Sequence, residues 1–293
     1  LPLGLEFCSL NLSDASDMGE VHSLLQAHYS EDDLGMFRLD YQPELIKWMS
    51  LVPGSKSNWF VGVRKSSENK QKSSFWSRLN CCSCFGGGGR KMAEASTNTE
   101  AESFGGELVG CVSATPLNVT LDGKNVTLAF INFLTLKKDL RAKRLAPILI
   151  REITRRVSSD GIFQAMFTGA KTIPTPLYTA QYQHRMLNVR KTQQVKFFQM
   201  AQSMTVDDYE KFYQVESPKK SAKGKEFVEI GGRAYRPMTE RDVEQVAELW
   251  ESSSRLRRLG ARFDHESIRH HLLPKPGIVS TYVTEAAPDG TPA

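Results

Sequence analysis

Hydrophobic residues along this chain recur with two spacings, which predict helices and strands in a defined order. Helical spacing is seen first in four residues that share one face, Met18, Val21, Leu24 and Leu25. A second helix is expected to begin at Pro43 and to run to Met49, because proline suits the first turn of a helix. Segments rich in apolar and β-branched residues predict strands at 59–63, 108–112 and 125–136.

The longest predicted helix follows a basic loop at 137–144. Four apolar residues repeat every four positions in it, Leu145, Leu149, Ile153 and Val157. We expect this helix to end near Gly161, and a further strand to follow at 162–167. Since a strand, a helix and a strand in this order form a crossover unit, the strands at 125–136 and 162–167 should be parallel.

A stretch at about 65–106 differs in composition from its surroundings. It is rich in Ser, Lys, Asn and Gly, and it lacks apolar periodicity. We interpret it as a disordered insert in the connection between two antiparallel strands, because long surface loops add little closure entropy.

The predicted elements near the end of the chain follow the same order as those near its start. Thr239–Asp242 is typical of a helix N-terminus, and the helix that follows has four inward residues, Val243, Val246, Ala247 and Trp250. A helix at 265–273 and a strand at 278–283 are expected next. This weak internal repeat, offset by about 220 residues, indicates two related units, and we expect the second to be incomplete.

Composition narrows the function classes. The 293-residue chain contains 40% hydrophobic and 24% charged residues, a balance that excludes a wholly disordered or collagen-like protein. Its net charge of +5 is modest, and we expect no nucleic-acid partner. No run reaches the ~18–20 apolar residues that cross a bilayer, and Leu1–Phe7 does not resemble a signal peptide. We therefore expect a cytoplasmic protein.

The five cysteines are an odd number, which favours a reducing compartment over a disulfide framework. Three of them lie together at Cys81, Cys82 and Cys84, beside basic and aromatic residues. This cluster allows three interpretations: a zinc site, S-palmitoylation or an inert loop. A zinc site lacks a nearby fourth ligand, so no metal is expected. Palmitoylation would give the insert a peripheral membrane contact and make the protein partly membrane-associated.

The segment from Phe133 to Pro147 is the strongest candidate for chemistry. A strand ends there, basic residues follow, and the N-terminus of a helix offers free N–H groups. Arg141, Lys143 and Arg144 add positive charge, so the segment is suited to hold a pyrophosphate. The alternative is a solvated basic loop, because no glycine-rich phosphate-binding pattern accompanies it.

Several runs of residues carry a resemblance to a known family. Three of them surround the candidate segment, Ile131-Asn132-Phe133-Leu134, Leu140-Arg141-Ala142-Lys143-Arg144-Leu145-Ala146-Pro147 and Ile150-Arg151-Glu152-Ile153-Thr154-Arg155-Arg156-Val157. Others are Glu31-Asp32-Asp33, Met36-Phe37-Arg38-Leu39-Asp40-Tyr41, Gly161-Ile162-Phe163-Gln164-Ala165 and Tyr182-Gln183-His184-Arg185. These runs closely resemble N-myristoyltransferase, the glycylpeptide N-tetradecanoyltransferase, over nearly the whole chain except the insert.

The resemblance implies an α/β (α+β) fold of the GNAT-like acyltransferase type, with one complete repeat and an incomplete second one. Residues 1–215 would form the first repeat, which binds acyl-CoA, and residues 216–293 the start of the second. The implied enzyme transfers myristate from myristoyl-CoA to the N-terminal glycine amine of protein substrates, by direct attack on the thioester. Myristoyl-CoA would be a co-substrate, and no permanently bound cofactor is expected.

The resemblance also assigns roles to residues. The backbone N–H groups of Phe133 and Leu134 would hold the oxyanion and be the catalytic groups. The acyl-CoA site would be lined by Phe133, Leu134, Thr135, Leu136, Ala142, Arg144, Leu145 and Ala146, to which we add Arg141 and Lys143 for their charge. The peptide groove would comprise Tyr29, Asp32, Asp33, Phe37, Leu39, Tyr41, Asn132, Thr168, Tyr182 and His184. By residue type alone, Asp32 and Asp33 are also typical of a solvated acidic turn. Tyr29, Phe37 and Tyr41 are also typical of an ordinary hydrophobic core.

Some positions depart from the family pattern. Leu39 replaces a phenylalanine, Phe167 a tyrosine and Leu34 an acidic residue. In the family the terminal carboxylate of the chain deprotonates the glycine ammonium, whereas this chain ends at Ala293, before the corresponding region. The alternative function is therefore a truncated or pseudo-enzyme that binds acyl-CoA or glycine peptides with little turnover.

Overall fold

The computed structural model describes residues 1, 4–29, 38–66, 106–169, 173–201, 203–214, 219–220, 228–230 and 233–284. Contacts divide the chain into two compact units. Unit 1 comprises Leu1–Thr168 and Glu240–His271, and unit 2 comprises Gly169–Thr239 and Leu272–Ala293. Residues 240–271 thus pack with the first unit. The boundary at residue 215 is a boundary between sequence repeats and stays a prediction.

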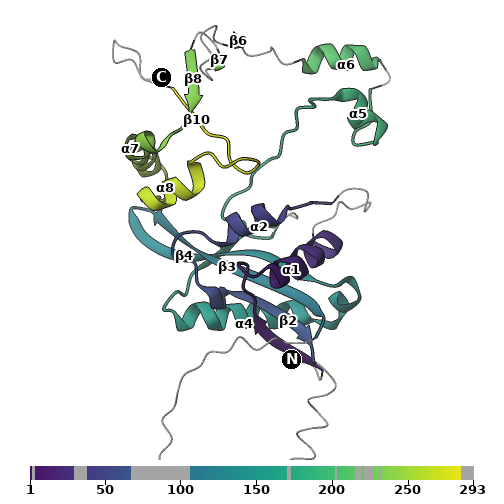
Figure 1. Ribbon diagram of the computed structural model, residues 1–293, viewed down its shortest axis with the longest axis vertical. Helices are drawn as coiled ribbons and strands as arrows, with labels where there is room; N and C mark the ends of the chain where they lie inside the picture. Colours follow the sequence, from purple (N-terminus) through teal and green to yellow (C-terminus); the bar gives the residue numbers. More distant parts are fainter. Residues whose placement is uncertain are drawn as a thin grey trace, which may run out of the picture. The chain divides into compact units, whose positions relative to one another are not determined.

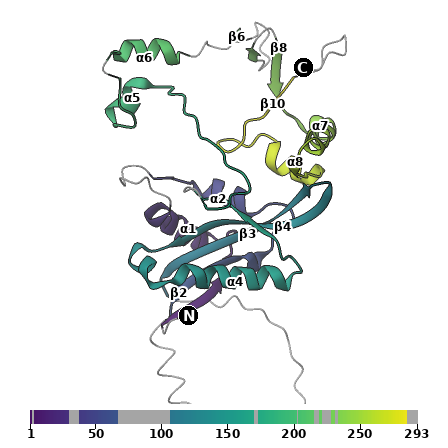
Figure 2. The same ribbon diagram turned by 180° about the vertical axis from the view of Figure 1, so that it is seen from behind.

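Unit 1 is built on a six-stranded sheet with helices on both faces (Figures 1 and 2). Its strands are β1 (Leu5–Ser9), β2 (Phe60–Lys65), β3 (Leu108–Leu121), β4 (Lys124–Leu136), β5 (Ala165–Phe167) and β9 (Leu259–Ala261). Its helices are α1 (Ala15–His28), α2 (Pro43–Ser50), η1 (Ser57–Trp59), η2 (Lys138–Lys143), α4 (Leu145–Ser159), η3 (Glu240–Asp242), α7 (Val243–Arg255) and α8 (His265–Leu272). The strand order is β1-β2-β3-β4-β5, and β9 pairs with β3.

The helical stripes predicted from the sequence are the buried faces of α1 and α4. The buried residues of α4 are the four predicted ones, Leu145, Leu149, Ile153 and Val157. They belong to a core cluster on one face of the sheet. The buried residues of α1 are also the predicted ones, Met18, Val21, Leu24 and Leu25. They belong to a second cluster, which also contains Phe133. Helix α4 therefore covers one face of the sheet, and α1 covers the other together with α2, whose Ile46 belongs to the second cluster.

Strands β3 and β4 form the central hairpin. Its two-residue turn, Asp122 and Gly123, has φ values of 45° and 79°. Two positive φ angles are what a type I′ turn requires, and Asp-Gly provides them at low cost. At its other side β4 pairs in parallel with β5, Ala129 with Ala165 and Ile131 with Phe167. The predicted crossover is confirmed, although β5 begins at Ala165, where this pairing starts, and not at residue 162.

The predicted antiparallel pairing around the insert is also confirmed. β2 pairs with β3, and the N–H of Lys65 donates to the carbonyl of Glu107 at 2.9 Å at the open end of the pair. Residues 67–105, with Cys81, Cys82 and Cys84, lie outside the described residues. Among the helices that the structure describes, none has the length and apolar character that crossing a bilayer requires.

The described residues of unit 2 include the helices α5 (Val189–Gln194) and α6 (Val206–Tyr213). Its four-stranded sheet has the order β10-β8-β7-β6, with the bounds Tyr282–Val283, Arg233–Pro237, Val228–Ile230 and Lys219–Lys220. The prediction of a strand at 278–283 is wrong for residues 278–281, because β10 comprises only Tyr282 and Val283. Lys275 and Val279 exchange backbone hydrogen bonds of 2.9 Å around Gly277, whose φ is 74°. This tight turn delays the strand until Tyr282.

Candidate active site

The junction that the sequence singled out contains a β-bulge. Ser113 of β3 pairs with Asn132 of β4, but Cys111 pairs with Thr135. Phe133 and Leu134 therefore face one residue of β3, and Phe133 has a φ of 55°. A bulge of this kind leaves one residue outside the regular ladder and bends the strand. The two residues predicted to hold an oxyanion through their backbone are the two that form the bulge.

The two side chains of the bulge have different environments. Phe133 is 1% exposed, whereas Leu134 is 38% exposed. The ring of Phe133 lies 5.9 Å from the rings of both Tyr29 and Tyr41, and 6.5 Å from that of Phe60. Packing among four aromatic rings fixes the backbone of the bulge from one face of the sheet.

Tyr29 links this aromatic cluster to the bulge. Burial raises the pKa of its hydroxyl above the ordinary value, and Tyr41 and Cys111 raise it further. A hydrogen bond with the backbone of Phe133 acts in the opposite direction on this pKa. The hydroxyl of Tyr29 is therefore un-ionised at neutral pH and lies at the backbone of the bulge.

Beyond the bulge, one edge of β4 is open. β4 pairs with β5 through residues 129–131, and its residues 132–136 have no strand partner on that side among the described residues. Backbone groups along an open edge are available to a ligand with amide groups of its own. Thr135 and Leu136 are buried, so their contribution to a ligand site would come from the backbone.

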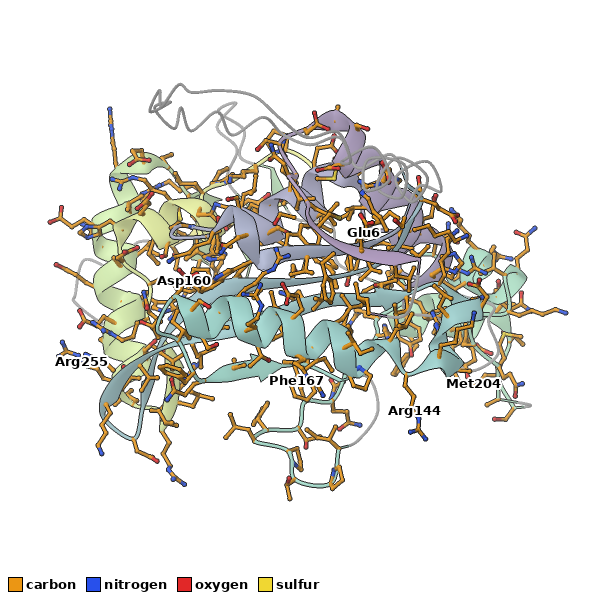
Figure 3. All side chains as sticks on the ribbon, turned by 90° about the horizontal axis from the view of Figure 1, so that it is seen from below. Glu6, Arg144, Asp160, Phe167, Met204 and Arg255 are labelled. Atoms are coloured by element: carbon orange, nitrogen blue, oxygen red, sulfur yellow. The ribbon has the colours of Figure 1, made fainter. Side chains whose placement is uncertain are left out.

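The basic loop leads directly to a helix N-terminus. The predicted loop contains the 3₁₀ helix η2, and Arg144 then takes a left-handed conformation with a φ of 54°. Arg144 is the N-cap of α4, and its side chain makes no capping hydrogen bond. Figure 3 shows the side chain of Arg144 on the outside of the protein, beside this helix end. Uncapped N–H groups beside the exposed cations of Lys143 and Arg144 form a suitable phosphate site.

Arg141 differs from the other two cations. Its guanidinium donates to the carbonyl of Leu136 at 3.4 Å and also to the carbonyl of His28, the last residue of α1. It therefore joins the end of β4 to the end of α1. Its contact with a cofactor stays a prediction, because part of its hydrogen-bonding capacity is used within the protein.

Two charged or titratable groups near the junction were missed in the sequence. His28 has a buried Nδ1 without a hydrogen-bond partner, and burial together with Lys137, Arg141 and Lys138 lowers its pKa, while Asp139 opposes this effect. Glu107 forms ion pairs with Lys65 at 2.6 Å and with Lys137. These two hydrogen-bonded ammonium groups, that of Lys137 foremost, lower the pKa of Glu107 to about 2. No motif in the sequence marks either residue: His28 is the last residue of α1, and Glu107 directly precedes β3.

The predicted peptide residues are only partly brought together. Tyr29, Tyr41 and Asn132 lie at the bulge, and the carbonyl of Asn132 accepts a hydrogen bond from the hydroxyl of Ser113 at 3.3 Å. Leu39 and Thr168 are exposed residues of unit 1. Tyr182 and His184 are exposed residues of unit 2, where the ring of His184 lies 5.7 Å from that of Phe197. Asp32, Asp33 and Phe37 lie outside the described residues, as does Leu34.

The remaining predicted residues of the acyl-CoA site show a graded burial. Leu145 is buried in the core under α4, Ala146 is half-buried and Ala142 is exposed. Within the described part of the chain, no group of three or more His, Cys, Asp and Glu side chains is placed to hold a metal ion.

Family models match most of the chain. The model described as "Myristoyl-CoA:protein N-myristoyltransferase, N-terminal domain" matches residues 1–77 and 97–180. The model for the C-terminal domain of the same family matches residues 194–290. The gap in the first match lies inside the insert that composition identified.

Curated relatives agree with these models. The glycylpeptide N-tetradecanoyltransferase of Drosophila melanogaster is 36% identical over 97% of this chain, and the match covers 50% of that protein. Glycylpeptide N-tetradecanoyltransferase 2 of Bos taurus is 35% identical over 97% of the chain and 48% of its own length. The chain thus spans about half the length of these relatives.

Solved structures with the same fold include Saccharomyces cerevisiae N-myristoyltransferase with bound myristoyl-CoA. It matches 99% of this chain and 58% of its own chain, with a TM-score of 0.75 and 28% identity. A second structure of the yeast enzyme, with bound myristoyl-CoA and inhibitors, has the same TM-score and identity. The predicted α/β fold of the GNAT-like type is confirmed by this likeness.

Proposed function

The chain belongs to the myristoyl-CoA:protein N-myristoyltransferase family, and from this premise we propose that it transfers myristate from myristoyl-CoA to the N-terminal glycine amine of protein substrates. The observation that carries the proposal is the bulge at Phe133 and Leu134, which lies one short segment before an uncapped helix N-terminus. An oxyanion site and a phosphate site in this order are what an acyl-CoA transferase needs.

The acyl-CoA would follow the segment from the bulge to α4. Its pyrophosphate would accept hydrogen bonds from the first N–H groups of α4 and meet the charges of Lys143 and Arg144. Its pantetheine amides would lie along the open edge of β4 at residues 132–136. This arrangement would bring the thioester carbonyl to the bulge.

The bulge would stabilise charge that develops during the reaction. The glycine amine attacks the thioester carbon, the new C–N bond forms, and the carbonyl oxygen becomes negative. When the C–S bond breaks, CoA leaves as a thiolate, which takes up a proton, and the ammonium formed on nitrogen loses one. The backbone N–H of Leu134 would donate to the oxygen while it is negative, and that of Phe133 would do so in place of its hydrogen bond with Tyr29, which favours the transition state over the substrate.

The peptide would enter beside the aromatic residues of the bulge. Tyr29, Tyr41 and Asn132 flank Phe133, so they are placed to contact the first residues of a peptide. The acidic Asp32 and Asp33 suit substrates with basic residues after the glycine. An α-amino group has a pKa of roughly 7.7–8.0, so the rate of transfer should rise with pH until the amine is neutral.

We also propose the repeat organisation expected from the sequence, with a first acyl-CoA-binding repeat at 1–215 and a second repeat that begins at 216. The similar order of helices near the two ends supports it. α1 and α2 precede β2, as α7 and α8 precede β10.

A transfer assay tests the proposed function. The chain is incubated with myristoyl-CoA and a glycine-initiated peptide, and the acylated peptide and free CoA thiol are quantified by mass spectrometry and a thiol reagent. A matched peptide without the α-amino group is the control. Equal amounts of acylated peptide and thiol, with neither from the control, are expected. Binding of myristoyl-CoA without transfer would support a binding protein. If the chain shows no binding and no transfer, the proposal is contradicted.

A membrane contact of the insert is a separate proposal, supported only by the sequence. Cys81, Cys82 and Cys84 lie beside Phe75, Trp76 and basic residues, a composition typical of S-palmitoylated segments. Cell fractionation of a variant with all three cysteines changed to serine tests it. An unchanged membrane fraction relative to the parent chain would contradict this contact.

A further inference from the structure

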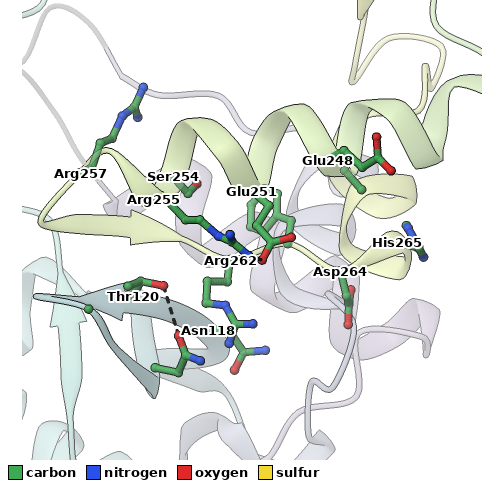
Figure 4. Close-up of a pocket in the computed structure, with 14 residues that line it drawn as sticks. Asn118, Thr120, Glu248, Glu251, Ser254, Arg255, Arg257, Arg262, Asp264 and His265 are labelled. Carbon is green, nitrogen blue, oxygen red and sulfur yellow. Dashed lines mark hydrogen bonds and ion pairs between the residues drawn. The ribbon is translucent and has the colours of Figure 1, made fainter.

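A cavity of about 620 Å³ lies in unit 1, beside the end of the central hairpin (Figure 4). One wall is formed by Asn118, Thr120 and Asn125 of β3 and β4, and the facing wall by α7. The segment from Arg262 to His265, which joins β9 to α8, closes a third side. None of the described residues assigned to acyl-CoA or peptide lines this cavity.

The walls are held together by several independent contacts. β9 pairs with β3 at residues 119–121, and the guanidinium of Arg258 donates two hydrogen bonds to the carboxylate of Asp122. The hydroxyl of Ser254 in α7 donates to the carbonyl of Ala261 in β9 at 3.0 Å. A Cβ atom on Gly260 would lie 2.8 Å from the carbonyl oxygen of Ser254, so the close approach of α7 to β9 requires glycine. The cavity is therefore preformed.

Two amide side chains present hydrogen-bond donors to the cavity. The Oδ1 of Asn118 accepts from the hydroxyl of Thr127 at 2.7 Å, and the Oδ1 of Asn125 accepts from that of Thr120 at 3.3 Å. With both carbonyl oxygens engaged, the NH₂ groups are the parts of these side chains that remain for a ligand.

Two guanidinium groups, those of Arg262 and Arg255, are further hydrogen-bond donors at the cavity. Arg262 makes no side-chain hydrogen bond or ion pair with any other residue that the structure describes, and Figure 4 shows it directed toward Asn118. Arg255 forms an ion pair with Glu251 at 2.7 Å and lies at the same cavity. Arg255 and then Arg262 lower the pKa of Glu251, so its carboxylate is charged and engaged. Asp264 is engaged too, because it accepts from the N–H of Ser267 at 2.8 Å.

We propose that this cavity binds a small phosphorylated molecule, whose phosphate oxygens are held by Arg262, Arg255 and the NH₂ groups of Asn118 and Asn125. Donors from three directions suit a tetrahedral phosphate better than a planar carboxylate, and guanidinium groups bind phosphate with two parallel hydrogen bonds. Phe263 and Ala247 supply an apolar part of the lining, which fits an organic phosphate monoester rather than the free ion.

Titration of the full chain with inorganic phosphate, phenyl phosphate and acetate tests the proposal. Binding is followed by the backbone amide signals of Gly123 and Arg262 in NMR spectra at constant ionic strength. We expect saturable shifts with both phosphates, at least threefold tighter binding of phenyl phosphate, and no saturation with acetate. Equal affinity for the two phosphates would contradict the claim that the ligand is an organic phosphate. Saturable binding of acetate would contradict the claim that the site prefers phosphate to carboxylate.

Three variants locate the site. Asn125→Asp places a carboxylate where the NH₂ group lies, and Arg262→Gln removes the guanidinium that has no ion-pair partner among the described residues, so each should weaken phenyl phosphate binding at least tenfold. Glu251→Gln releases Arg255 and should tighten binding severalfold. Arg151→Gln, an exposed arginine of α4, is the matched control and should leave the affinity within twofold. If Arg262→Gln and Asn125→Asp behave like this control, the proposed site is wrong.

Discussion

Trp48 and His270 form a reciprocal contact across 222 positions of the chain. The indole N–H of Trp48 in α2 donates to the carbonyl of His270 at 2.8 Å, and the Nε2 of His270 in α8 lies 2.8 Å from the carbonyl of Trp48. Since a carbonyl can only accept, Nε2 carries the proton. The two rings are stacked at 5.8 Å. This pair fastens the segment 240–271 to the first unit.

We predict that Trp48→Phe destabilises the protein by about 1–3 kcal/mol, because the ring contact is kept while the carbonyl of His270 loses its donor. Urea unfolding measures this change. Lys47→Ala, at an exposed position of the same helix, is the control and should change the unfolding free energy by less than about 0.5 kcal/mol. Equal midpoints for Trp48→Phe and the parent chain would show that the contact does not contribute to stability.

Substitutions in the bulge should separate packing from chemistry. Phe133→Ala removes a buried ring that touches three other aromatic rings, and should cost about 3–5 kcal/mol of unfolding free energy. Leu134→Ala, at the exposed neighbour, should cost less than about 1 kcal/mol. Because Leu134→Ala keeps its backbone N–H, it should retain most of any transfer activity. A loss of activity above tenfold in a folded Leu134→Ala protein would count against a backbone role.

Reversal of the charge at Arg144 should weaken acyl-CoA binding. Arg144→Glu puts a carboxylate beside the N-terminus of α4, where the pyrophosphate is proposed to lie, and should raise the dissociation constant of CoA at least tenfold. Calorimetric titration measures it. Arg151→Glu makes the same charge change at another exposed position of α4 and should have an effect below threefold. Equal effects of the two variants would show that CoA affinity depends on the net charge of the protein, and would contradict a local phosphate site at Arg144.

His28 should make stability depend on pH. Its pKa in the folded protein lies below the ordinary value of 6.5, because burial, Lys137, Arg141 and Lys138 disfavour the charged ring. The unfolded chain therefore takes up a proton at higher pH than the folded chain, and stability should fall as the pH decreases through 6.5 toward the folded pKa. Unfolding free energies of the parent chain and His28→Asn between pH 5 and 8 test this.

The His28→Asn protein should lose less stability on acidification than the parent chain, and His265→Asn, at an exposed position of α8, should behave like the parent. Parallel pH profiles for His28→Asn and the parent would contradict the assignment.

The sequence predicted the helices well and the irregular features poorly. In α1 and α4 the buried residues are those with helical spacing, because burial there follows local periodicity. The bulge at Phe133 carries no such signal, since no glycine or proline marks it in the strand sequence at 124–136. The family resemblance, and not periodicity, pointed to these two residues.

Contacts between distant segments were beyond sequence reasoning. The ligand contact that charge suggested for Arg141 stays a prediction, and no sequence pattern indicated its hydrogen bonds to the carbonyls of His28 and Leu136. The pairing of β9 with β3 joins residues 259–261 to the first sheet, although the sequence repeat suggested a separate unit. Such pairings depend on which edge is open in the folded chain, and a single sequence does not specify this.

Amide chemical shifts on addition of myristoyl-CoA test the central claim most directly, that the segment 133–147 holds the acyl thioester. We predict that the largest shifts occur at Phe133, Leu134 and residues 144–146, that CoA alone shifts only 144–146, and that both effects saturate. Saturable binding with the largest shifts elsewhere in the described chain, or no shift at all, would contradict the account.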